Sequence, residues 1–261
     1  MKKASFFSAP APGTCRLLHP LRQGPVTSPI SWDGIDLVVF DVDGTLYDQR
    51  RLRLAMLGLL LADGLRTRSL ATLRTLRTFR RVRESLGETP AESFVQEQYA
   101  RTALRHGMKA EDVERLATEW LERRPLPMLA ACRYPHVDAL FAALLRSGRQ
   151  VAVFSDYPAS AKLEALGLQV DHVVCATDPD IGRLKPDPAG LVAVMRACGA
   201  SPQRTLMIGD RADRDGAAAR RAGAQALIRS ARPIPGHLTF RSFDELVFRP
   251  VMDQRSVPAG G

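Results

Sequence analysis

The side chains best suited to chemistry in this sequence are two aspartates that directly follow an apolar run. The run is LVVF at 37–40, and Asp41 comes next, with Asp43 two residues later and Gly44-Thr45 behind it. Two carboxylates this close suit a hard cation together with a nucleophile or a proton carrier. Taken alone, the same residues could be a strand followed by a solvated Asp-Gly turn.

The apolar run predicts a strand that is buried on both faces of a parallel sheet. Further strands are expected at 150–154, 172–175, 205–208 and 225–228. Helical patterns lie between them, which predicts an α/β fold with a Rossmann-like, doubly wound parallel sheet and right-handed crossovers. In such a sheet, ligands bind outside the carboxyl ends of the strands.

Other polar residues fall at the same ends of later strands. Ser155 ends the second strand, Asp210 ends the fourth, and Lys185 precedes the helix after the third. Singly, these residues could be a cap, a turn residue and a surface charge. Together, the acids, a hydroxyl and an ammonium describe a magnesium-assisted phosphate site.

The segment between the first two strands is predicted to be helical. A Leu-rich helix at 51–63 is expected to be well buried, an apolar stripe runs from 70 to 86, and a capping box at 89–92 predicts a new helix. With a fourth helix around Trp120, these form an inserted four-helix cap at 49–127. The α/β core is expected at 34–48 and 128–250, and it includes a helix at 243–248. Residues 1–33 are predicted to be a disordered or misassigned extension, and residues 251–261 a tail.

Composition fits an ordinary globular protein. The 261 residues are 45% apolar and 25% charged, and no apolar run is long enough to span a bilayer. Four scattered cysteines without a CxxC pair argue against zinc and for a reduced, cytoplasmic protein. The net charge of +9 raises nucleic acid as a partner. However, the arginines between Arg50 and Arg83 lack interleaved aromatic residues, which favours a solvated helical face.

These segments resemble the haloacid dehalogenase-like (HAD) superfamily of hydrolases. The four motifs of that family match DVDGT at 41–45, Ser155, Lys185 within KPDP, and GDRADRD at 209–215. The helical insert is similar to a C1-type cap. Asp156 departs from the Asn or small residue that often follows the serine, and it is expected to contribute mainly a backbone N–H.

The resemblance implies a role for each matching residue. Asp41 would attack phosphorus to give an aspartyl-phosphate, and Asp43 would serve as the acid and then the base. Mg²⁺ would be held by Asp41, Asp210 and the Asp43 carbonyl. Phosphate would be bound by Ser155, Gly44, Thr45 and Asp156, and Lys185 would offset negative charge. Asp215 would orient Lys185 or a water on the metal.

The second aspartate selects among reactions. A halide leaving group needs no acid, and the dehalogenases of the family lack a residue corresponding to Asp43. We therefore expect a Mg²⁺-dependent phosphatase that acts on a small phosphorylated metabolite. The alternatives are a phosphomutase or phosphotransferase of the same fold, and a basic protein that binds RNA or another polyanion.

A few polar residues are left without a fixed role. Lys162 is expected to be solvated, and the five histidines show no metal-ligand spacing. Tyr47, Arg50, Arg51 and Arg53 follow the first motif, where they could reach a substrate or could be hinge and surface residues.

Overall fold

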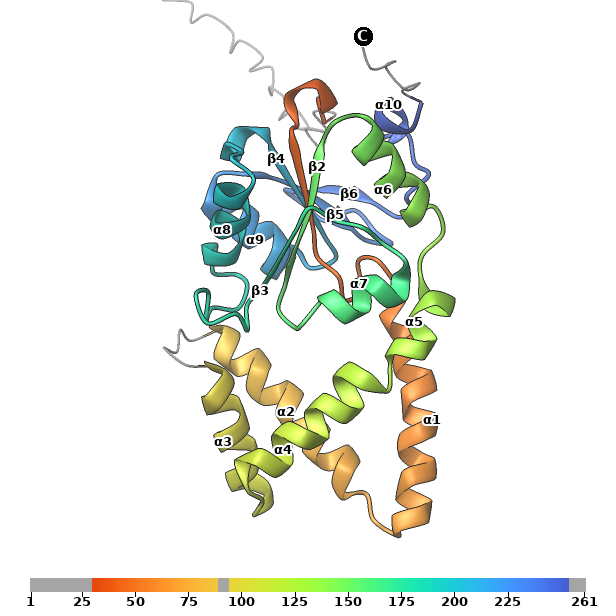
Figure 1. Cartoon of the computed structure of the whole chain (residues 1–261), viewed down its shortest axis with the longest axis vertical. Helices are drawn as coiled ribbons and strands as arrows, with labels where there is room; N and C mark the ends of the chain where they lie inside the picture. The colour runs from red at the N-terminus through yellow and green to blue at the C-terminus, as the bar shows by residue number, and fades with distance from the viewer. Residues whose placement is uncertain (1–29, 89–93, 254–261) are drawn as a thin grey trace, which may run out of the picture.

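A parallel sheet forms the centre of the molecule. The computed structural model describes residues 30–88 and 94–253. Within them the sheet contains six strands in the order β3-β2-β1-β4-β5-β6, all parallel (Figure 1). The strands are β1 (Leu37–Phe40), β2 (Gln150–Ser155), β3 (His172–Cys175), β4 (Thr205–Gly209), β5 (Gln225–Arg229) and β6 (Leu238–Phe240). The predicted α/β class is confirmed.

Strand β1 is apolar throughout because both of its faces are covered. All four of its side chains are fully buried, with Val38 and Phe40 in one apolar cluster and Leu37 and Val39 in the other. Helices α6 (Val137–Arg146) and α10 (Arg249–Met252) lie on one side of the sheet, and α8 (Ala189–Ala197) and α9 (Ala217–Ala222) lie on the other (Figure 1). The chain order reverses between β1 and β4, so the carboxyl ends of these two strands flank a topological switch point.

A helical segment between β1 and β2 stands next to the carboxyl ends of the strands (Figure 1). Its helices are α1 (Gln49–Thr67), α2 (Ala71–Glu88), α3 (Phe94–His106) and α4 (Ala110–Ala117), followed by a π-helical turn at Thr118–Arg123 and by α5 (Leu126–Cys132). Gly107, with φ of +59°, directly follows the end of α3. The two connections to the sheet run side by side, since Tyr47 and Arg133 form an antiparallel bridge. We call helices α1–α4 the cap.

Helix α1 differs from the prediction that it would be well buried. Only Leu52, Met56 and Gly64 are buried along its 19 residues, whereas Leu54 and Leu65 are 71% and 82% exposed. The prediction was wrong because it assumed that a helix with apolar residues on most faces is also buried on most faces. In the structure α1 stands at the edge of the molecule and packs along one side only (Figure 1).

The ends of the fold also correct the sequence-based prediction. Residues 30–33 were expected to lie outside the fold, but Trp32 is only 3% exposed within the core. No helix forms at 243–248; turns occupy that stretch, preceded by β6 and followed by α10.

The capping box at 89–92 lies outside the described residues. Among the described helices, none is both long and apolar enough to cross a membrane.

Candidate active site

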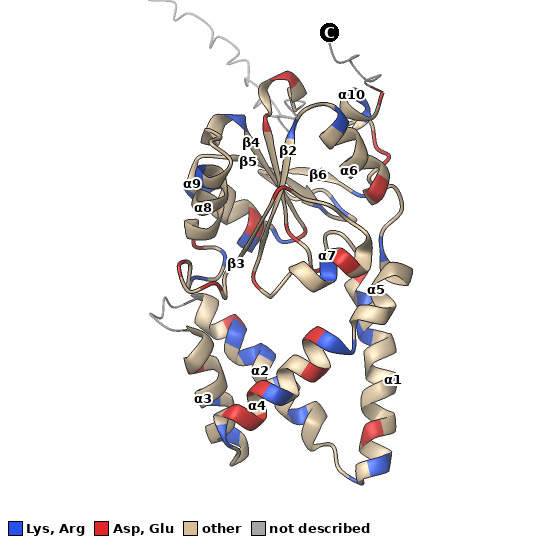
Figure 2. Cartoon of the chain, viewed as in Figure 1, with Lys and Arg blue, Asp and Glu red and all other residues tan. Residues whose placement is uncertain are grey.

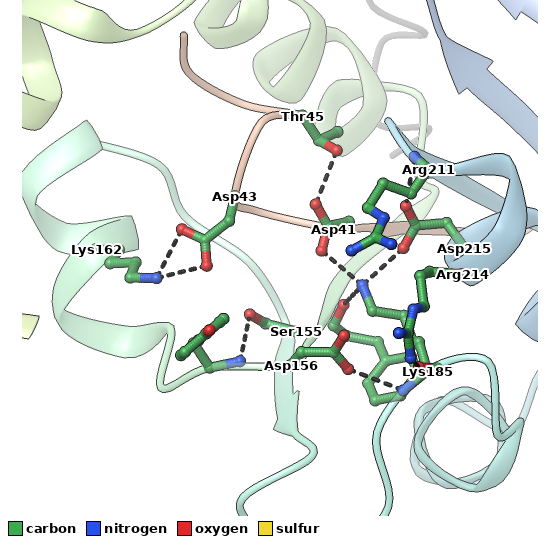
Figure 3. A network of polar contacts seen from close by, with 12 residues as sticks. Asp41, Asp43, Thr45, Ser155, Asp156, Lys162, Lys185, Arg211, Arg214 and Asp215 are labelled. Atoms are coloured by element: carbon green, nitrogen blue, oxygen red, sulfur yellow. Dashed lines mark hydrogen bonds and ion pairs between the residues drawn. The ribbon is translucent and has the colours of Figure 1, made fainter. Parts of the chain in front are cut away.

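Asp41 leaves the end of β1 and meets an ammonium group from a distant loop. Its Oδ1 accepts a hydrogen bond of 2.6 Å from Lys185 Nζ, and its Oδ2 accepts one of 2.8 Å from the Thr45 hydroxyl. The Asp41 backbone N–H donates to the Ile208 carbonyl on β4. Asp41 is 6% exposed and Thr45 is fully buried, so the orientation of this carboxylate is fixed from both sides (Figure 3).

Lys185 uses all three of its N–H donors in this site. Besides Asp41, its Nζ donates to Asp215 Oδ1 at 2.7 Å and to the Phe154 carbonyl at 3.3 Å. Burial alone would lower the Lys185 pKa, but Asp215 and Asp41 raise it well above its usual value. Lys185 is therefore a charged ammonium within a group of acids.

Three carboxylates from the segments that follow β1 and β4 come together here. One oxygen each from Asp41, Asp210 and Asp215 lie within 4.8 Å of one another. Burial raises the pKa of Asp210 to about 6, and the neighbouring charge of Asp215 adds to the effect. Burial also raises the pKa of Asp41 well above its usual range, despite Lys185, and Asp215 and Asp210 add to the shift. The single ammonium leaves this cluster with excess negative charge.

Glycine is required where the chain passes this cluster. Gly44 has φ of +96°, a conformation that L side chains rarely adopt, and a Cβ there would overlap the Asp210 carboxylate. The DVDGT turn can therefore bring Asp41 and Asp210 together only with glycine at this position. Gly44 lies against the carboxylate cluster.

Asp43 points away from Asp41, toward helix α7 (Ser160–Leu166) (Figure 3). Both of its carboxylate oxygens lie 2.7 Å from Lys162 Nζ, and the Tyr47 hydroxyl donates to Oδ1. Burial alone would raise the pKa of Asp43, but Lys162 and Tyr47 bring it below its usual value. Lys162 is 7% exposed, so the prediction of a solvated lysine is wrong.

Ser155 and Asp156 follow the end of β2. The Ser155 Oγ accepts a hydrogen bond of 3.2 Å from the Tyr157 N–H. Asp156 was expected to contribute mainly a backbone N–H, but its side-chain Oδ1 accepts a hydrogen bond of 2.9 Å from the Lys185 N–H. Burial raises the pKa of Asp156. Its side chain thus fastens the loop that carries Lys185, which corrects the prediction.

Two arginines join the site to the cap. Arg214 Nη1 donates to the Lys185 carbonyl at 2.6 Å, and its Nη2 lies 3.0 Å from Glu84 on α2. From α2, Arg83 donates to the Asp156 carbonyl and lies 4.0 Å from the centre of the Tyr157 ring. Both arginines are 7% exposed, so the solvated face predicted for this stretch does not include Arg83.

Sequence reasoning missed Lys162, Arg83, Arg214 and the Asp156 side chain. A helical spacing says which residues share a face, but it does not say what packs against that face. One usable signal was present for Lys162. The sequence has only five lysines, at 2, 3, 109, 162 and 185, and two of these five are buried here beside Asp43 and Asp41.

Comparisons with known proteins agree with this arrangement. A family model described as a haloacid dehalogenase-like hydrolase matches residues 35–223. A phosphoglycolate phosphatase of Rhodospirillum rubrum is 32% identical over 200 residues, which cover 74% of this chain and 78% of the relative. These matches confirm the expected family and phosphoric monoester hydrolase class.

Solved structures show the same fold. The putative HAD-hydrolase YfnB of Bacillus subtilis, bound to magnesium, has a TM-score of 0.60 at 16% identity, and the match covers 84% of this chain and 99% of YfnB. CbbY of Rhodobacter sphaeroides, in complex with phosphate, has a TM-score of 0.55 at 22% identity. That match covers 84% of this chain and 100% of CbbY. The chain belongs to the haloacid dehalogenase-like hydrolases, within which it is a phosphoric monoester hydrolase.

Proposed function

We propose that the chain hydrolyses the phosphate monoester of a small metabolite through an aspartyl-phosphate on Asp41. The observation that carries this proposal is the placement of the Asp41 carboxylate. It is oriented by Lys185 and Thr45 and lies beside Asp210 and Asp215, at the carboxyl end of the central strand. A fixed carboxylate with a cation at hand suits attack on an anionic phosphate.

The reaction would proceed in two displacements. In the first, an Asp41 oxygen forms a bond to phosphorus while the ester P–O bond breaks, and Asp43 gives its proton to the leaving oxygen. In the second, a water attacks the same phosphorus, Asp43 takes a proton from that water, and Asp41 is released with inorganic phosphate. Lys185 offsets the negative charge that gathers around Asp41 in both steps.

The acid cluster suits a magnesium ion. Its donors are all carboxylate oxygens within 4.8 Å of one another, and hard cations prefer oxygen ligands. Asp41, Asp210 and the Asp43 carbonyl would hold the ion. Asp215 is better suited to orienting Lys185, because its Oδ1 accepts from Lys185 and its Oδ2 from the Arg211 N–H. When bound, the ion supplies positive charge that offsets the charge on the phosphate.

The cap favours a substrate with a second acidic group. The side chains of Arg53 on α1 and Arg80 on α2 form no hydrogen bond or ion pair with any described residue, and the charge of Asp43 acts on Arg80. Burial lowers the Arg80 pKa, and the nearby charge of Arg53 adds to the effect. Two cap cations, of which Arg80 is influenced by the charges of Tyr157 and Asp43, suit an anion beyond the phosphate. The name of the curated relative makes phosphoglycolate the first substrate to try.

The test is phosphate release by purified protein with and without Mg²⁺. Phosphoglycolate, p-nitrophenyl phosphate and an alkyl phosphate without a second acidic group are supplied in parallel. We expect turnover that requires Mg²⁺, is lost in Asp41→Asn, and has a lower KM for phosphoglycolate than for the alkyl phosphate. Absence of turnover with every substrate, or unchanged turnover in Asp41→Asn, would overturn the proposal. Transfer of phosphate to an added sugar without its release would favour a phosphotransferase.

A further inference from the structure

Each aspartate of the DVDGT motif has a lysine of its own. Lys185 is paired with Asp41, and Lys162 is paired with Asp43. Figure 3 shows the two pairs on different sides of the site, with Lys162 reaching Asp43 from helix α7. The first pair belongs to the proposed attack on phosphorus. In the second pair Asp43 is the proposed acid and base, whereas Lys162 has no part in the mechanism derived above.

The contacts of Lys162 are those of a residue that fixes a carboxylate. Its Nζ lies 2.7 Å from both Asp43 oxygens, and the two side chains are only 8% and 14% exposed. The Tyr47 hydroxyl is a second donor to the same carboxylate. The ammonium also lies 5.3 Å from the centre of the Tyr157 ring, which covers it. With two donors from two different segments, the Asp43 side chain is restricted to one orientation.

A purely structural role explains this arrangement poorly. Burying an ion pair costs several kcal/mol per ion in desolvation, and an apolar pair of similar volume is often as stable. Lysine is also rare in this chain, which has five lysines among its 37 basic residues. A compact ammonium can bind both oxygens of one carboxylate on a single flexible stem. A role in the chemistry of the site therefore explains the buried Lys162 better than a role in the stability of the core.

We infer that Lys162 is a positioning residue that, together with Tyr47, holds Asp43 in place for its proton transfers. The inference rests on the proposed function, because it assigns Lys162 to the acid of that reaction. When Asp43 gives its proton to the ester oxygen, the electron pair of the O–H bond stays on the carboxylate. Lys162 and Tyr47 then hydrogen bond to the carboxylate so formed, in the arrangement that the structure contains.

Leaving-group dependence separates this role from general damage. An alkyl phosphate needs a proton on its leaving oxygen, whereas p-nitrophenolate leaves readily without one. In Lys162→Met we expect kcat to fall about 100-fold with the alkyl phosphate, at the low end of the usual effect of acid–base catalysis, and less than about threefold with p-nitrophenyl phosphate. Lys162→Arg should restore part of the alkyl phosphate activity. The matched control is Lys109→Met, which removes an exposed lysine of the cap and should change neither rate.

A double-mutant cycle shows whether Lys162 acts through Asp43. In an Asp43→Asn background, Lys162→Met should cause no further loss with either substrate, and this double variant also avoids an unpaired buried charge. Equal losses with both phosphates in Lys162→Met, or additive losses in the double variant, would overturn the inference. If the wild type hydrolyses neither phosphate, it is the proposed function that fails.

Discussion

At the scale of single residues, the site depends on side chains that hold other side chains. Thr45 orients Asp41, Asp156 fastens the Lys185 loop, and Asp215 anchors the Lys185 ammonium. These contacts matter because misplacing a reacting group by about 1 Å can cost 10²-fold in rate. Substitutions at such positions should act on activity through the geometry of their partners.

Asp156 provides a clean test of this view. Asn keeps a carbonyl oxygen that can accept the hydrogen bond from the Lys185 N–H, and it removes the burial penalty that raises the Asp156 pKa. We expect Asp156→Asn to keep activity within about twofold and to be at least as thermally stable as the wild type. Asp156→Ala loses the acceptor and should lower kcat/KM by about tenfold, corresponding to the ~1.4 kcal/mol of one typical hydrogen bond.

Steady-state kinetics and thermal unfolding of the two variants measure these effects. If Asp156→Asn were as damaged as Asp156→Ala, the negative charge of Asp156 would be what matters, and its role as a fastener of the loop would be wrong.

At the scale of elements, the local pattern predicted the sheet well. Strands β1, β2 and β4 lie where apolar runs end in polar residues, because a strand buried on both faces must be apolar over most of its length. The motif acids follow from the same rule, since parallel strands end at one edge of the sheet. Short β6 was missed because its sequence, LTF, has no run of apolar residues.

The same pattern could not predict what covers each helix. The periodicity of α1 shows which of its faces are apolar. Which of those faces is buried depends on elements that are distant in the sequence and pack against the helix. Arg83 and Lys162 illustrate the opposite error, because single charged residues on helices were expected to be solvated and are buried beside the site. Their partners, Asp156 and Asp43, are 73 and 119 residues away in the chain. No local window contains both members of either pair.

Two substitutions in α1 test its one-sided packing. Met56→Ala removes a buried side chain and should lower the free energy of unfolding by about 2 kcal/mol or more. Leu65→Gln changes a side chain that is 82% exposed to a residue of similar helix propensity, and should change that free energy by less than about 0.5 kcal/mol. Urea denaturation of both variants gives the comparison. A loss at Leu65 as large as that at Met56 would mean that the outer face of α1 is covered in solution.

At the scale of the whole molecule, the cap and the sheet are joined by polar contacts around the site. Glu84 on α2 accepts from Arg211 and Arg214, while Arg83 reaches the carbonyl of Asp156. Basic and acidic residues are mixed over both parts of the molecule (Figure 2), which fits contacts of this kind. These contacts hold α2 of the cap against the loops that carry Asp156 and Lys185.

Metal binding should be visible in the stability of the whole chain. Mg²⁺ at 100 times its dissociation constant should stabilise the wild type by about 2.7 kcal/mol, provided that only the folded state binds it. Asp210→Asn removes one carboxylate from a crowded cluster in which burial and Asp215 raise the Asp210 pKa to about 6. The metal-free variant should therefore be at least as stable as the metal-free wild type, and Mg²⁺ should no longer stabilise it.

Thermal unfolding with Mg²⁺ and with a chelator checks this prediction, and Asp33→Asn, an exposed acid outside the carboxylate cluster, serves as the control. An equal shift in wild type and Asp210→Asn would place the ion elsewhere.

The most direct measurement of the central claim is the position of phosphate on the chain during turnover. Wild type and Asp43→Asn, in which breakdown of the intermediate should be slow, are mixed with p-nitrophenyl phosphate, whose leaving group needs no acid, and with Mg²⁺. The samples are quenched in acid, digested and analysed by mass spectrometry. The account predicts a phosphoryl group on the peptide that contains Asp41, and none in Asp41→Asn. Turnover with no modified peptide, or with the phosphoryl group on another residue, would contradict it.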